Sequence, residues 1–185
     1  MNFRDQVRAK LGTLRPRELA SGFSREAAVL MPIFEHGGEP HFLLTRRTEE
    51  VETHKGQISF PGGMRQDDEP LEQTALRETF EEVGIGSGRI EILGRFHDYI
   101  SITEYRVTPF VGLMEEPLPV MPQPREVAEV LSVPLQVFCD PNRMRVERLH
   151  RTGRAVDVYF YSYGTYTIWG LTARIIKDFL EELRR

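Results

Sequence analysis

Residues 60–85 of this 185-residue chain read FPGGMRQDDEPLEQTALRETFEEVGI, which predicts a glycine turn followed by an amphipathic helix. Pro70 suits the first helical position and Gly84 the position after the end, so we expect a helix over 70–83. At about 100° per residue, one side of that helix is apolar and carries Leu76, Phe80 and Val83. The opposite side carries three carboxylates, those of Glu78, Glu81 and Glu82.

The acidic face of this helix works against the stability of the helix. Glu78 and Glu82 are like charges four residues apart, which costs about 0.2–0.5 kcal/mol. Glu81 and Glu82 also lie in the last turn, where the helix dipole disfavours each anion by about 0.3–1 kcal/mol. The alternative interpretation is a solvated acidic surface. A divalent cation would turn the repulsion into attraction, and Mg²⁺ prefers oxygen ligands, so the pattern favours a metal site.

The turn before the helix brings bare backbone to the same place. Gly62 and Gly63 permit close approach to a phosphate or a metal, although a simple tight turn is the alternative interpretation. Glu69, just ahead of the helix, either caps the helix or joins the carboxylate cluster.

The rest of the chain alternates between strand and helix patterns. Strands are expected at 27–34, 41–46, 57–60, 90–100, 105–114, 127–133, 144–150, 155–161 and 165–169, and further helices at 2–14, 134–139 and 172–183. Pro32 indicates an edge strand or a bulge, and the Gly37-Gly38 and Thr152-Gly153 pairs predict hairpin turns. Thr48 to Lys55 and the proline-rich residues 115–125 are expected to be surface loops. This mixture predicts an α/β sandwich with a mixed sheet.

Composition narrows the class of protein. A chain of 185 residues suits a single domain, 1–185. The net charge of -4 argues against nonspecific nucleic-acid binding. The lone Cys139 excludes an intrachain disulfide and is expected to be a small buried side chain. The charged start and the absence of a long apolar run argue against a signal peptide and a membrane span, so we expect a cytoplasmic protein whose oligomeric state stays open.

Residues 63–85 resemble the box of the Nudix hydrolase family, Gly-x5-Glu-x7-Arg-Glu-U-x-Glu-Glu-x-Gly-U, where U is bulky and apolar. Gly63 begins the match, Glu69 follows, and Arg77-Glu78 and Glu81-Glu82 stand at the required spacing. Thr79 departs from the pattern at one U position. The resemblance implies a Nudix-type α/β/α sandwich and hydrolysis of a nucleoside diphosphate linked to another group.

A second stretch resembles the additional motif of the coenzyme A pyrophosphatases within that family, Leu-Leu-Thr-x-Arg-[Ser/Ala]-x3-Arg-x3-Gly-x3-Phe-Pro-Gly-Gly. The matching residues are Leu43-Leu44-Thr45-Arg46-Arg47, Gly56 and Phe60-Pro61-Gly62-Gly63. Thr48 and Glu52 depart, the latter standing where the motif has arginine. The resemblance implies coenzyme A as the small-molecule substrate, with 3′,5′-ADP and 4′-phosphopantetheine as products.

The family resemblance also implies roles for individual residues, with Mg²⁺ or Mn²⁺ as cofactor. The expected metal ligands are Glu78 and Glu82, then Glu81, with Glu69 and the Gly63 carbonyl as weaker candidates. Arg77 is expected to orient the glutamates. A general base is expected either among the box glutamates Glu81 and Glu82 or on a distant loop, at Glu126 or Glu129. Substrate phosphates are expected to meet Arg46, Arg47, Arg65 and the backbone of Gly62 and Gly63.

Two other functions stay open. One is a Nudix pyrophosphatase acting on a different nucleoside diphosphate, such as ADP-ribose or a dinucleotide, and Glu52 keeps it open. The other is a non-catalytic module that senses a nucleotide. The chain keeps every glutamate of the box, which disfavours the sensor.

Overall fold

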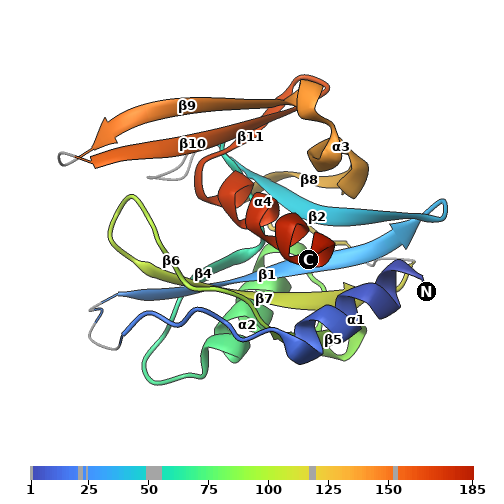
Figure 1. Ribbon diagram of the computed structural model, residues 1–185. Coiled ribbons are helices and arrows are strands. Elements are labelled where there is room, and N and C mark those ends of the chain that lie inside the picture. Colours follow the sequence, from blue (N-terminus) through green and yellow to red (C-terminus); the bar gives the residue numbers. More distant parts are fainter. Residues whose placement is uncertain (1, 21–22, 24, 49–55, 117–119, 152–153) are drawn as a thin grey trace.

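A mixed β-sheet forms the centre of the computed structural model, which describes residues 2–20, 23, 25–48, 56–116, 120–151 and 154–185 (Figure 1). Within those residues the sheet has eight strands. They are β1 (Glu26–His36), β2 (Glu39–Arg47), β3 (Ile58–Ser59), β4 (Gly62–Met64), β5 (Ile90–Arg95), β6 (Tyr99–Ile100), β7 (Arg106–Met114) and β8 (Val127–Pro134). The main path runs β3-β2-β1-β7-β5, with β4 paired to β1, β6 to β7 and β8 to β2. β1 and β7 run parallel, and the other pairings recorded for the described residues are antiparallel.

Helices cover both faces of this sheet, which confirms the predicted sandwich. On one face, α2 (Leu71–Val83) packs its Ala75, Leu76 and Val83 into a core cluster with Ala28 and Leu30 of β1. On the other face, α1 (Phe3–Thr13) and α4 (Gly170–Arg184) share a larger core cluster with the sheet. Among the described residues, no helix is long and apolar enough to cross a membrane.

A second sheet lies beyond α4, so that α4 is enclosed between two sheets (Figure 1). Its strands are β9 (Met144–Arg151), β10 (Arg154–Tyr163) and β11 (Tyr166–Trp169), in the order β11-β10-β9. The short helix α3 (Leu135–Cys139) and the 3-10 turns η1 (Ser87–Arg89) and η2 (Pro141–Arg143) complete the described elements. The sequence predicts these strands, and the Thr152-Gly153 turn expected between two of them lies outside the described residues.

Three expectations are wrong, and a fourth, the burial of Cys139, is met only in part. Pro32 lies in a central strand: β4 pairs with residues 27–29 of β1 and β2 with residues 33–36, so the missing N–H of Pro32 falls between the two ladders. Residues 90–100 form two strands, because Phe96 to Asp98 leave the ladder. Phe80 is not part of the packed face of the helix, since it is 58% exposed.

Candidate active site

Local sequence fixes the C-terminal end of α2, the helix that carries the acidic side chains. Gly84 adopts the left-handed conformation, with φ 75°, and its N–H bonds to the Phe80 carbonyl. Thr79, the departure from the box, is fully buried and donates its hydroxyl to the Ala75 carbonyl at 2.7 Å. The helix therefore keeps its packing with a small polar side chain at that position.

The two glycines of β4 let the strand approach α2 and β1 closely. A Cβ at Gly63 would stand 2.5 Å from the Glu78 carboxylate. Gly62 has φ +155°, and a Cβ there would collide with the backbone of β1. Its N–H donates to Glu82 Oε2 at 3.3 Å. Only bare backbone fits at Gly62, whereas a side chain at Gly63 would displace the Glu78 carboxylate.

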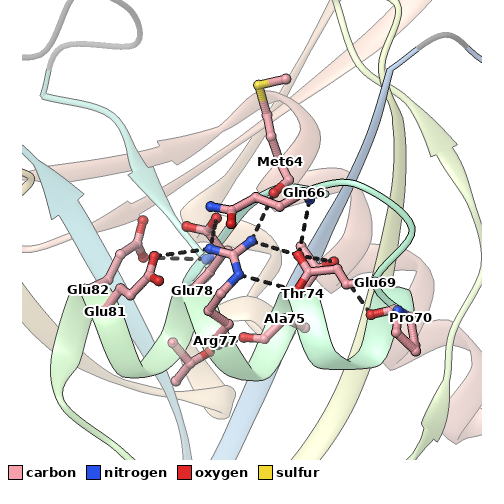
Figure 2. A network of polar contacts seen from close by, with 12 residues as sticks. Met64, Gln66, Glu69, Pro70, Thr74, Ala75, Arg77, Glu78, Glu81 and Glu82 are labelled. Carbon is pink, nitrogen blue, oxygen red and sulfur yellow. Dashed lines mark hydrogen bonds and ion pairs between the residues drawn. The ribbon is translucent and has the colours of Figure 1, made fainter.

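Arg77 joins the acidic side chains into one network (Figure 2). Its Nη1 donates to Glu78 Oε1 at 2.8 Å and to Glu81 Oε2 at 3.0 Å. Its Nη2 donates to Glu69 Oε1 at 2.8 Å and to the Met64 carbonyl at 3.0 Å. Hydrogen bonds from Arg77 hold the pKa of Glu69 at about 2. Arg77 therefore contacts three of the four carboxylates of the acidic row, which consists of Glu69, Glu78, Glu81 and Glu82.

Glu82 is the buried member of the row. Its exposed fraction is 4%, and burial raises its pKa to about 8. Arg47 opposes that shift with Nη1 3.8 Å from Glu82 Oε1. Burial also raises the pKa of Glu78, and Glu126 adds like charge near both carboxylates. Buried acids under this repulsion are groups that a divalent cation would stabilise.

The donor set fits a divalent cation such as Mg²⁺ or Mn²⁺, because it consists of carboxylate oxygens beside an accessible backbone. Within the described residues, however, no group of three acidic, histidine or cysteine side chains is placed so that it could already hold a metal ion. Arg77 explains this, since it draws Glu69, Glu78 and Glu81 onto its own guanidinium group. Binding of a cation requires some of these carboxylates to turn from Arg77 toward Glu82.

The segment after residue 119 brings Glu126 to this site. The Met121 N–H donates to the Val83 carbonyl at 2.8 Å and the Gln123 N–H to the Glu82 carbonyl at 2.9 Å. The Thr48 N–H donates to the Glu126 carbonyl at 3.0 Å. These bonds satisfy the end of α2 and link it to the end of β2.

The remaining predicted residues lie apart from the carboxylates. Glu129 is paired with Arg46, Nε to Oε2 at 3.2 Å, and not with the acidic row. Arg65 is held by the Glu26 carboxylate and by the Glu69 carbonyl at 2.7 Å. The sequence analysis missed Glu26, as well as Thr74, which donates its hydroxyl to Glu69 Oε1 at 2.9 Å. Glu26 gives no signal in the sequence because its partners are distant in the chain.

Comparisons with known proteins identify a family model and relatives that match most of the chain. The family model of the NUDIX domain matches residues 24–155. The uncharacterized Nudix hydrolase NudL of Photorhabdus laumondii is 38% identical over 170 residues, 91% of this chain and 90% of that protein. The NudL of Yersinia pestis is 40% identical over 164 residues, covering 88% and 82%. Among solved structures, a MutT protein from Methanosarcina mazei superposes with a TM-score of 0.55 at 24% identity, covering 94% of this chain and 97% of that one.

Proposed function

Because this chain belongs to the NUDIX domain family and is a Nudix hydrolase, we propose that it is a coenzyme A pyrophosphatase. Water would be added across the diphosphate bond of coenzyme A or a derivative, giving 3′,5′-ADP and 4′-phosphopantetheine from coenzyme A itself. One observation carries the hydrolytic part: Glu82 is buried beside Glu78 and the bare backbone of Gly62 and Gly63. The spacing of Leu43 to Gly63, which matches the coenzyme A motif, supports the substrate.

Nudix hydrolases generally use divalent metals such as Mg²⁺ or Mn²⁺. In the proposal, Glu78 and Glu82 are the main ligands and Glu81 is next, with Glu69 and the Gly63 carbonyl as further ligands. A bound cation would lower the pKa of water and neutralise phosphate oxygens. Burial of Glu82 favours this assignment, because an ionised carboxylate needs a cationic partner there.

Arg77 acts as the organiser of the carboxylates in this proposal. It contacts Glu69, Glu78 and Glu81 simultaneously, so it limits the directions in which they turn. A guanidinium group suits this task because it offers five donors in one plane.

Glu126 is the proposed general base, with Glu81 or Glu82 as the alternative. Its backbone is fixed against β2, and its carboxylate lies near enough to influence Glu78 and Glu82. It is exposed and is not paired with Arg77 in the described structure. A carboxylate in that position can take a proton from a water molecule between itself and the substrate.

Arg47 is the proposed contact for the hydrolysed diphosphate. It lies next to Glu82, and its buried Nε has no hydrogen-bond partner among the described residues. An incoming phosphate oxygen would satisfy that donor. Arg65 is a weaker candidate for this diphosphate, and Arg46 is a weaker candidate for a phosphate elsewhere on the substrate, since each is engaged with a carboxylate.

A second substrate class is supported by Glu52, which replaces the second arginine of the coenzyme A motif. Loss of that positive charge favours a substrate with fewer phosphates, such as ADP-ribose or a dinucleotide. The site on α2 would perform the same hydrolysis on either substrate class.

The test is hydrolysis of a panel of nucleotide substrates with Mg²⁺, followed by separation of the products. The panel contains coenzyme A, ADP-ribose, NADH and an oxidised dGTP. We expect coenzyme A to give the highest kcat/KM. A preference for another member would overturn the substrate assignment, and unchanged turnover in Glu82→Gln would overturn the metal assignment.

A further inference from the structure

Arg46 and Arg47 are adjacent on β2, but their side chains lie on opposite faces of the sheet. Arg47 reaches Glu82 on the α2 face. Arg46 alternates with Leu44, a member of the core cluster that contains α1 and α4, so it lies on the α4 face. The two arginines therefore cannot bind the same phosphate in the same way.

A tyrosine from the second sheet fixes the ion pair of Arg46. Arg46 and Glu129 are direct partners in the β2–β8 ladder. Arg46 Nε donates to Glu129 Oε2 at 3.2 Å, and the Tyr166 hydroxyl donates to Glu129 Oε1 at 2.7 Å. Both carboxylate oxygens are thus engaged, which limits rotation of Glu129 and holds the plane of the guanidinium group.

The other two nitrogens of Arg46, Nη1 and Nη2, have no recorded acceptor in the described part of the chain. The side chain of Arg46 is 34% exposed, so these N–H groups are within reach of a ligand. Two parallel N–H groups match the oxygens of a phosphate monoester.

Arg46 is also connected to the proposed site of hydrolysis. It pairs with Ile58 of β3, and β3 leads within four residues to Gly62. One extended substrate with its diphosphate at β4 would pass around the end of the sheet to place a second anionic group near Arg46.

We propose that Arg46 binds a phosphate monoester of the substrate, separate from the hydrolysed diphosphate, and that Glu129 and Tyr166 are positioning residues for Arg46. The inference rests on the proposed function for the identity of the substrate. The ligand chemistry is a phosphate monoester on the 3′ position of the ribose, which coenzyme A and 3′,5′-ADP carry and which dephospho-coenzyme A and AMP lack.

The test compares the binding of 3′,5′-ADP and AMP by calorimetry in the presence of Mg²⁺. We expect the wild type to prefer 3′,5′-ADP, and Arg46→Ala to lose about tenfold of that preference, as for removal of a charged hydrogen bond. Tyr166→Phe should lose a smaller part, about threefold. In the Arg46→Ala background, Tyr166→Phe should have no further effect, because it acts through Arg46.

Tyr163→Phe is the matched control, because Tyr163 is the partner of Tyr166 in the β10–β11 ladder. Its hydroxyl donates to the Ser132 carbonyl of β8 at 3.4 Å and so also links the two sheets, without touching Glu129. Equal losses in both tyrosine variants would indicate a purely structural link and overturn the inference. An unchanged preference in Arg46→Ala would overturn it as well.

Hydrolysis of coenzyme A and dephospho-coenzyme A separates this inference from the proposed function. For the inference, the KM for coenzyme A should rise in Arg46→Ala and in Tyr166→Phe by a larger factor than the KM for dephospho-coenzyme A does. Absence of hydrolysis of both compounds would overturn the proposed function, whereas the binding preference for 3′,5′-ADP would still decide the inference.

Discussion

Replacement of Glu82 by glutamine should stabilise the metal-free protein at neutral pH. Its pKa is about 8 in the folded protein and 4.5 ordinarily, because burial disfavours the charged form. Between these two values the folded protein retains a proton that the unfolded chain has lost, so the free energy of unfolding falls as pH rises. At pH 7 the resulting cost is about 3 kcal/mol, since each pH unit above the ordinary pKa contributes about 1.4 kcal/mol. Glutamine avoids this cost.

The assay is thermal unfolding of wild type and Glu82→Gln in a chelator across pH 5 to 8. We expect the variant to melt higher at pH 7 by about 6–12 °C, given the size of the chain, and the gap to close toward pH 5. Glu81→Gln is the control on the same helix, because Glu81 is exposed and should change stability by less than about 1 kcal/mol. With Mg²⁺ added, the wild type should gain more stability than Glu82→Gln. Equal stability of the two proteins at every pH in the chelator would refute the reasoning.

Three other changes test separate parts of the site. Gly63→Ala places a Cβ 2.5 Å from the Glu78 carboxylate. Because that carboxylate can rotate away, the melting temperature should change little while kcat falls at least about tenfold. An unchanged kcat would contradict the close approach of β4 to Glu78. Arg77→Lys should lower kcat and raise the pKa of Glu69, because a single ammonium group cannot contact three carboxylates at once. Titration of the carboxyl groups by NMR measures this pKa. A pKa of Glu69 that stays at about 2 would exclude the network. Glu126→Gln should lower kcat by about 10²–10⁴ with metal affinity kept, and a normal kcat in pre-steady-state kinetics would remove Glu126 as the base.

Local sequence predicts α2 well because its signals act within a few residues. Pro70 and Gly84 bound the helix, and the three-to-four-residue spacing assigns Glu78 and Glu82 to one ridge. The same spacing wrongly predicts that Phe80 is buried. Helix geometry gives the direction in which a side chain points, but it does not show whether another element covers that side chain.

Contacts between distant segments are the part that the sequence does not predict. Glu126 and Glu129 look alike in the sequence, yet the turn at Gln123 brings Glu126 to the end of α2, whereas Glu129 faces Arg46 in the ladder. The strand pairings decide which carboxylate belongs to which site. The sequence also does not predict that α4 is enclosed between two sheets, because the second sheet forms through the pairing of β11 with β10.

Binding of Mn²⁺ is the most direct measurement of the central claim that the ridge on α2 holds a divalent cation. Mn²⁺ is titrated into wild type, Glu78→Gln, Glu82→Gln and the control Glu72→Gln, which lies in the first turn of α2, and bound metal is followed by electron paramagnetic resonance. The account predicts that wild type and Glu72→Gln bind alike and that the other two variants bind at least about tenfold more weakly. Equal Mn²⁺ affinity in all four proteins would contradict it.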